Sequence, residues 1–224
     1  MLPVFLAAGV LPHLALGTNM LQSSAGTLAA AYAFVRQGQV TLREAIPGLV
    51  CTIAGAVGGV VAVQHLAPAL LNDVLPLVLA GIVIYTVCSP RLGLVDTLPT
   101  MLPGMFYPLS GVGLGFFDGC IGAGAGSLWA MAFVVGLEFN FSKATAYAKV
   151  MNAASNVAAF TLFLSYGSVW LAAGLVMALG QVVGGVLGAH LVMHKGAGFV
   201  RPLYLIVAIA LLLKLLYARV AGIG

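Results

Sequence analysis

Long apolar segments run through nearly the whole chain, and they restrict its possible folds more than any other feature. The segment LYLIVAIALLLKLL, from Leu203 to Leu216, contains a single charged residue. Of the 224 residues, 62% are hydrophobic and 6% are charged, whereas a soluble domain carries roughly a quarter of charged residues. The segments do not alternate apolar and polar residues, as the strands of an outer-membrane barrel do. The sequence therefore predicts an all-α, polytopic membrane protein.

Helices that span a bilayer need about 20 apolar residues, and this length divides the chain. A short apolar piece at 127–139 would cover roughly 20 Å as a helix, so whether it crosses the membrane or is re-entrant stays open. We expect about seven to eight transmembrane helices plus short broken or re-entrant pieces. The longer segments are about 14–35, 45–65, 74–87, 101–117, 142–166, 169–193 and 199–220. In the second of them, the small residues at 54–62 predict close approach of a neighbouring helix.

The two halves of the chain repeat each other. A shift of 129 residues places Gly38 to Val40 on Gly167 to Val169 without a gap. The same shift pairs four more identical residues: Phe34 with Phe163, Gly55 with Gly184, Val57 with Val186 and Gly59 with Gly188. We therefore divide one membrane domain into a first repeat at 1–90, a polar linker at 91–100 and a second repeat at 101–224. The first repeat lacks a glycine-rich element of its own, so we expect it to be incomplete at its N-terminus.

The basic residues indicate how the two repeats are oriented, because short cytoplasmic loops are rich in lysine and arginine. If the segments on both sides of the central glycines cross the membrane, the halves are inverted repeats, which is a transporter architecture. If the short piece is re-entrant, Lys143, Lys195 and Arg201 move to the outer side. The first arrangement obeys the rule better. It puts Arg219 outside and the following residues in the cytoplasm: Arg36, Arg43, Arg91, Lys143, Lys195 and Arg201.

Polar residues inside the predicted helices are the candidates for a site. Thr145, Lys149, Asn152 and Asn156 follow one another at spacings of 4, 3 and 4, which places them on one helix face. The Lys149 ammonium either extends to the interface or faces a polar cavity. A lysine that only reached the interface would not require the asparagines beside it, so we favour the cavity.

The matching helix of the first repeat also carries polar residues. Interhelical hydrogen bonding is one explanation of such a face, because membrane bundles use it routinely. A contribution to a binding site is the other explanation, and the sequence does not separate the two. The residues concerned are Thr18, Asn19, Gln22, Ser23 and Gly26.

The stretch GFFDGCIGAGAGS, from Gly115 to Ser127, interrupts the apolar sequence with glycines and an aspartate. A helix broken by glycine is tolerated at membrane depth where its backbone lines protein or a watery cavity. We expect a half-helix that begins near Ser127 to present free N–H groups and a positive dipole end, which suits a small oxyanion beside Lys149. Asp118 is then a counter-ion for Lys149, which we favour, or a proton carrier. The glycines of this predicted site are Gly119, Gly122, Gly124 and Gly126.

Several functional classes lack support in the sequence. The net charge of +4 comes from scattered basic residues, so we expect no nucleic-acid partner. Cys51, Cys88 and Cys120 have neither disulfide nor metal spacing, and His190 and His194 lack a third ligand. No nucleophile lies beside a base. We therefore predict a protein that is not an enzyme and that has no cofactor and no metal.

The glycine stretch, followed by KATAYAKVMNAASNVAAF and GSVW, resembles the second repeat of the TauE/SafE sulfite-exporter family, and most closely its YfcA-like branch. LALGTNMLQSSAGTLAAAYAFVRQGQV resembles the first-repeat motif. The resemblance covers nearly the whole chain, in order and at matching spacing. Members open with a glycine-rich stretch before the segment that matches Met1, which agrees with the incomplete first repeat.

The resemblance implies a multi-pass protein of the bacterial inner membrane that transports small sulfur-containing anions. It assigns the glycines to a binding loop, Lys149 and Asn152 to one core motif, and Thr18, Asn19 and Gln22 to the other. We expect a secondary transporter that works by alternating access, with a small anion, lipid and possibly a coupling proton as partners, and a homo-oligomer as a possible assembly. The alternative is a non-transporting membrane subunit that anchors or assembles a partner. Substrate, direction and coupling ion are left open.

Overall fold

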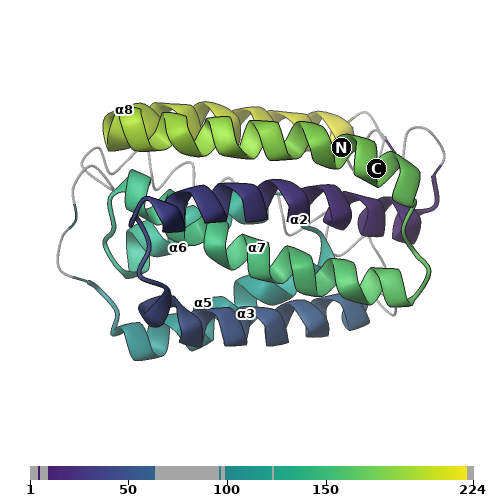
Figure 1. The fold of residues 1–224 in the computed structure, drawn as a ribbon, viewed down its shortest axis with the longest axis horizontal. Coiled ribbons are helices and arrows are strands. Elements are labelled where there is room, and N and C mark those ends of the chain that lie inside the picture. Colours follow the sequence, from purple (N-terminus) through teal and green to yellow (C-terminus); the bar gives the residue numbers. More distant parts are fainter. Residues whose placement is uncertain (1–4, 6–9, 64–95, 97–98, 123, 221–224) are drawn as a thin grey trace.

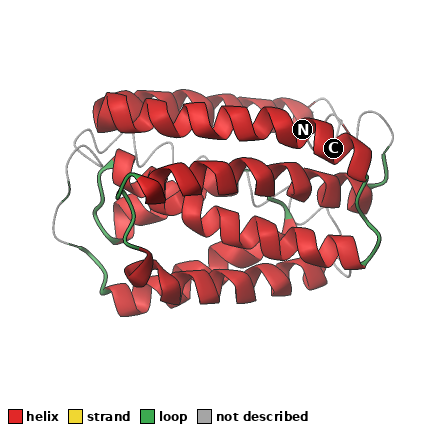
Figure 2. Cartoon of the chain, viewed as in Figure 1, coloured by secondary structure: helices red, strands yellow, loops and turns green. Residues whose placement is uncertain are grey.

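The computed structural model describes residues 5, 10–63, 96, 99–122 and 124–220 (Figure 1). Every regular element in this part of the chain is a helix, as Figure 2 shows, and the predicted all-α class is confirmed. The helices are α2 (Pro12–Arg36), α3 (Leu42–Val63), α5 (Pro103–Cys120), α6 (Ala125–Gly136), α7 (Phe141–Ser165) and α8 (Leu171–Val220). The predicted segment at 74–87 lies outside the described residues.

The helix ends follow from local sequence. Proline occupies the first turn of α2 and α5, where its missing N–H and fixed φ angle favour a helix start. Asn140 caps α7 by accepting a hydrogen bond from the Lys143 N–H. The predicted helices 169–193 and 199–220 correspond to the two parts of α8, which are separated by the non-helical residue Gly196, where φ is 68° and ψ is -173°.

Helix α7 occupies the centre of the molecule. It packs against each of the other five described helices, whereas α8 covers α2 on one side and α3 pairs with α5 on the other (Figure 1). Large aromatic side chains around the first half of α7 form much of the core, including Phe106, Trp129, Phe133 and Tyr147. Any residue on the buried faces of α7 is therefore shared among several helices.

Glycines bring α3 and α5 into backbone contact, as the small residues at 54–62 predict. A Cβ atom at Gly59 would lie 2.2 Å from the Phe116 carbonyl oxygen, and one at Gly119 would lie 2.3 Å from the Ala56 oxygen. Real Cβ atoms do not approach that closely, so both positions require glycine. The prediction of a close helix contact is confirmed, and it places Gly119 in that contact.

Polar and apolar residues are distributed inside out compared with a soluble protein. Asp118, Asn152, Asn156 and other polar side chains are buried, while large apolar side chains are exposed along α3, α5 and α8. Leu42–Val63 and Leu171–Gly196 are long and apolar enough to cross a membrane. An apolar exterior over a polar interior is the arrangement expected of a helical bundle in lipid.

The 129-residue shift also relates helix boundaries. Helices α2 and α7 each contain 25 residues, and Pro12 and Phe141 at their starts are 129 positions apart, as are Leu42 and Leu171 at the starts of α3 and α8. Gly38 and Gly167 occupy the intervening turns with φ angles of 72° and 66°.

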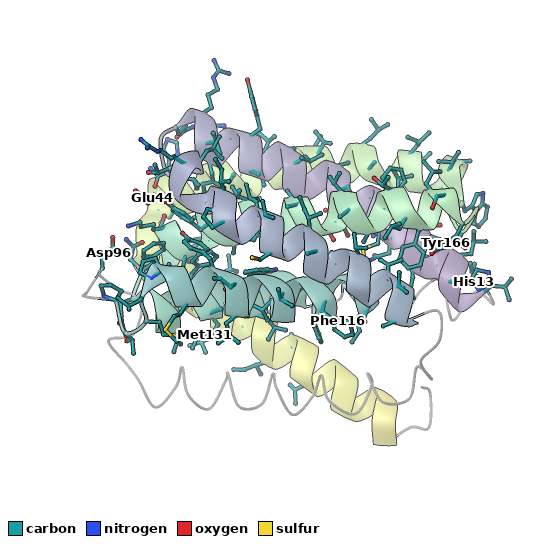
Figure 3. All side chains as sticks on the ribbon, turned by 90° about the horizontal axis from the view of Figure 1, so that it is seen from below. His13, Glu44, Asp96, Phe116, Met131 and Tyr166 are labelled. Carbon is teal, nitrogen blue, oxygen red and sulfur yellow. The ribbon has the colours of Figure 1, made fainter. Side chains whose placement is uncertain are left out.

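Helices α2 and α7 run in opposite directions. Figure 3 shows His13 and Tyr166 at one end of the bundle and Glu44 and Asp96 at the other. Helix α2 starts near His13, whereas α7 ends next to Tyr166. The two helices with matching lengths therefore lie antiparallel at the centre of the fold.

Candidate functional site

The glycine stretch breaks between α5 and α6, three residues later than the sequence predicts. Helix α5 continues to Cys120, so Asp118 and Gly119 belong to its last turn and not to a loop. The helix continues because the glycines in this turn pack against the α3 backbone. Gly122 and Gly124 then adopt left-handed φ angles of 69° and 83°, and these turn the chain into α6.

The amide groups at the start of α6 are partly occupied. The Ala125 N–H donates to the Gly122 carbonyl at 3.4 Å, and the Ser127 N–H donates to the Gly124 carbonyl at 2.9 Å. We expected free N–H groups at the start of this half-helix, but the N–H groups of Ala125 and Ser127 are bonded because the tight turn supplies acceptors within the glycine segment. What faces the α7 side chains is the bare Cα of Gly126.

Gly126 lies directly against the polar face of α7. A Cβ atom on Gly126 would approach the Asn152 Nδ2 to 3.0 Å and the Lys149 Nζ to 3.9 Å. On the other side of the segment, a Cβ on Gly122 would lie 2.7 Å from the Met20 Cε. Gly122 thus lies against α2 and Gly126 against α7, and glycine at position 126 leaves out a side chain that would press on Asn152 beside Lys149.

Asn152 and Asn156 continue this polar face toward α2. The Asn156 Nδ2 donates to the Asn152 Oδ1 at 2.9 Å and lies 3.4 Å from the Thr27 Oγ1. Sequence reasoning did not include Thr27 among the candidates. A signal was present, since Thr27 lies 129 positions before Asn156 and is its counterpart under the sequence shift. The polar face of α2 therefore meets the polar face of α7 at Thr27 and Asn156.

The other α2 candidates bond mostly within their own helix or at its end. The Gln22 Nε2 donates to the Asn19 Oδ1 at 2.8 Å, and Ser23 is half-buried one residue further along. The Thr18 hydroxyl donates to the Leu14 carbonyl and accepts from the Trp170 N–H at 2.9 Å. Thr18 thus ties α2 to the start of α8, and interhelical bonding explains its position.

Asp118 faces α7 from the end of α5. Its Oδ2 makes a short hydrogen bond with the Ser155 hydroxyl, and Ser155 is a second residue that sequence reasoning missed. Asp118 and Lys149 do not form an ion pair within 4.0 Å, although their charges interact. The charge interaction with Lys149 therefore favours the predicted counter-ion role of Asp118, although the two side chains are not in direct contact in the described structure.

Two buried acceptors near these helices have no hydrogen-bond partner among the described residues. They are the Gln22 Oε1 and the Asp118 Oδ1. The Trp129 Nε1 is a buried donor that likewise has no partner among the described residues. Buried polar atoms in native proteins are nearly always bonded to protein, water or a ligand. The helices around the glycine segment therefore retain unused hydrogen-bonding capacity in an otherwise apolar bundle.

A second polar cluster lies at the end of the bundle near Glu44. Asp96 accepts hydrogen bonds from the N–H and Nδ2 of Asn140 at 2.6 and 2.7 Å, and the Lys143 Nζ lies 3.3 Å from its Oδ2. Burial raises the pKa of Asp96, but the bonds from Asn140 and the Lys143 charge outweigh it and the pKa is lowered. This cluster fixes the start of α7 and lies two turns away from Lys149.

Basic residues gather at the same end of the bundle. Arg36 ends α2 and Arg43 begins α3, next to Glu44, which the Tyr147 hydroxyl contacts at 3.3 Å. The Ser142 hydroxyl donates to the Val192 carbonyl at 3.4 Å, which brings Lys195 to the end that holds Lys143. At that end, the His194 Nδ1 lies 2.8 Å from the His190 carbonyl oxygen, so one of its two ring nitrogens is already engaged.

The family model for the sulfite exporter TauE/SafE matches residues 1–215. The chain belongs to the TauE/SafE family. Proteins of the TauE/SafE family are membrane transporters, and the buried polar residues and apolar exterior agree with an integral membrane protein.

Similar curated proteins carry transporter names. The probable membrane transporter protein YfcA of Escherichia coli K12 is 38% identical over 216 residues, which cover 96% of this chain and 80% of that protein. The probable membrane transporter protein ORF9 of Sinorhizobium sp is 39% identical over 96% of this chain and 82% of its own length. A probable membrane transporter protein of Haemophilus influenzae is 38% identical, with 96% and 85% covered. No solved structure matches the chain.

Proposed function

We propose that this TauE/SafE protein is a secondary transporter that carries a small sulfur-containing oxyanion or organosulfonate by alternating access. The observation that carries the proposal is the placement of Lys149 and Asn152 against the bare Cα of Gly126. A cationic ammonium and an amide donor there lie beside a position where any side chain larger than that of glycine would crowd Asn152. Charge-assisted hydrogen bonds from such groups suit the oxygens of a sulfite or sulfonate.

The substrate site lies between the two antiparallel central helices. The anion contacts Lys149 and Asn152, while Asn156 and Thr27 join α7 to α2 behind it. Gly122 and Met20 border the same glycine segment from the α2 side. Ser23 and Gln22 extend the polar lining along α2, and the unpartnered Gln22 Oε1 supports a hydrated path there.

Alternating access draws its support from the relation between the halves. Two elements with the same lengths run in opposite directions, and a broken helix lies beside them, which is the pattern of transporters built from inverted repeats. We infer seven to eight membrane crossings in a bacterial inner membrane. The end of the bundle that holds Arg36, Arg43, Lys143 and Lys195 then faces the cytoplasm.

The experiment is uptake of labelled sulfite into proteoliposomes, with methanesulfonate and acetate as competitors. We expect Lys149→Met to abolish saturable uptake, because losing one partner of a buried charge pair costs roughly 2–5 kcal/mol of binding. Lys143→Met is the matched control, since it makes the same charge change on the same helix at the surface pair with Asp96. Equal loss in both variants, or full uptake in Lys149→Met, would contradict the proposal.

A second pair of variants tests the need for glycine beside Lys149 and Asn152. Gly126→Ala places a methyl group 3.0 Å from the Asn152 Nδ2, so we expect weaker sulfite binding in a folded protein. Gly113→Ala changes a glycine on α5 that has no described atom within 4 Å of its Cβ position, and we expect unchanged transport. Uptake that is absent from the wild type for every sulfur anion, together with a co-purifying protein, would favour the assembly subunit instead.

A further inference from the structure

The carboxyl group of Asp118 is enclosed by protein with incomplete hydrogen bonding. The residue is 1% exposed, its Oδ2 bonds to Ser155, and its Oδ1 has no partner among the described residues. A buried carboxylate needs a paired charge or several donors to remain ionised. Asp118 has neither a cation within 4.0 Å nor a second donor in the described structure.

The surroundings of Ser155 show where a proton fits. Its hydroxyl oxygen lies near three acceptors: the Asp118 Oδ2, the Met151 carbonyl at 3.3 Å and the Asn152 carbonyl at 3.1 Å. A hydroxyl has one hydrogen to donate. If Asp118 is protonated, it donates to the Ser155 oxygen while Ser155 donates to the Asn152 carbonyl, and each hydrogen has an acceptor. If Asp118 is ionised, Ser155 is its one donor.

Few titratable groups lie around Asp118 in the part of the chain that the structure describes. From α7, Lys149 acts on it through its charge, and α6 contains no titratable residue. On α5 itself, the Cys120 thiol donates to the Gly59 carbonyl at 3.1 Å. From α3, Cys51 lies against Gly111, two turns earlier on α5. Arg43 and Glu44 begin α3 some 18 Å along its axis from Ala56, which contacts Gly119.

We propose that Asp118 carries a proton that crosses the membrane together with the anion. The inference rests on the proposed function and adds its coupling ion. An ionised Asp118 shares the attraction of Lys149 and repels the anion, whereas a protonated Asp118 leaves Lys149 to the anion. Asp118 therefore binds a proton from water on one side as the anion binds, and returns it to water on the other side as the anion leaves. Only the carboxyl O–H bond forms and breaks.

The coupling must be reciprocal, because each ligand changes the affinity for the other by the same factor. Ser155 lies on the same helix as Lys149 and Asn152, so the proton and the anion both act on α7. The carboxyl group does not contact the anion in this arrangement. Asp118 is a coupling residue, and its loss should uncouple the two ligands without removing the anion site.

The test measures methanesulfonate affinity of the purified full chain in detergent from about pH 5 to about pH 9, where the sulfonate itself does not titrate. We expect wild-type affinity to fall with rising pH by roughly 5-fold to 150-fold, the usual range of a coupling between two sites. Asp118→Asn mimics the protonated carboxyl group, and we expect it to bind methanesulfonate without this dependence. Asp96→Asn, which neutralises an aspartate outside the site, should keep the wild-type profile.

Each result decides between the two proposals. Wild-type binding that does not depend on pH, or the same pH dependence in Asp118→Asn, overturns the proton role while the anion site stands. If the wild type binds neither methanesulfonate nor sulfite at any pH, the proposed function and the proton role are overturned together. Should Asp118→Asn fail to fold, wild-type proteoliposomes containing a pH-sensitive dye decide. Entry of labelled methanesulfonate should acidify the interior, and entry without acidification overturns the inference.

Discussion

Helices α2 and α7 have the same length and the same place in their halves, yet they differ in charge. Lys149 on α7 stands 129 positions after Met20 on α2, and the two side chains lie beside Gly126 and Gly122 respectively. The two positions related by this shift thus border the same glycine segment, but the cation is present on α7 alone. In the proposed transporter, this single charged position gives a small anion one place to bind.

The neighbouring helices differ in the same manner. Gly59 of α3 lies against the α5 backbone, whereas its counterpart on α8, Gly188, is exposed and has no described atom within 4 Å of its Cβ position. Among the described residues, the difference separates glycines that are needed for helix contact from glycines that only share the pattern. Positions related by the 129-residue shift therefore need not have equivalent roles.

The largest predicted effect concerns this pair of glycines. We expect Gly59→Leu to destabilise the protein by about 3 kcal/mol or more, because the new side chain overlaps the Phe116 backbone in a well-packed contact. Gly188→Leu should leave stability unchanged or raise it by up to about 1 kcal/mol, since leucine favours a helix more than glycine does. Thermal unfolding in detergent measures both. Equal losses would show that an undescribed segment packs on α8 as α5 packs on α3.

Much of the fold could be predicted from the sequence, because the length of each apolar segment indicates where a helix begins and ends. The bounds of α2, α3, α5 and α7 lie within three residues of the prediction. The end of α5 was placed too early, because glycine and aspartate weaken an isolated helix, whereas the contact of Gly119 with Ala56 stabilises this one. Tertiary packing of that kind leaves no local signal.

The candidate site was predicted in part. The spacing of Lys149, Asn152 and Asn156 placed them on one face, and the structure brings Gly126 to that face. Ser155 lies at the edge of this face, three residues after Asn152, and was missed because its role depends on Asp118 from another helix. The roles of these residues in binding remain predictions, because a polar face identifies a position and not its ligand.

The contact between Thr27 and Asn156 permits a sharper test of the repeat. These counterparts meet each other across α2 and α7, so exchanging them should largely restore the pair. We expect Thr27→Asn and Asn156→Thr each to cost about 0.6 kcal/mol, the average for an interhelical hydrogen bond in a membrane protein. The double variant should lose less than the sum. A double-mutant cycle from thermal unfolding measures the coupling, and strictly additive losses would mean that the contact contributes nothing.

The last prediction concerns the starts of the two helices. Asn140 caps α7 with its side chain, whereas Leu11, its counterpart before α2, does not. Asn140→Ala should cost about 1 kcal/mol at neutral pH, measured by thermal unfolding. The folded-state pKa of Asp96 is lowered. Its contribution to the free energy of unfolding is therefore present above the ordinary pKa of 3.8 and is lost as the pH falls through the lowered pKa. The cost of Asn140→Ala should therefore shrink under acid, since Asp96 then no longer holds the asparagine as a carboxylate. In an Asp96→Asn background, the cost of Asn140→Ala should not vary with pH. A pH-dependent cost in that background would show that Asp96 is not the cause of the pH dependence.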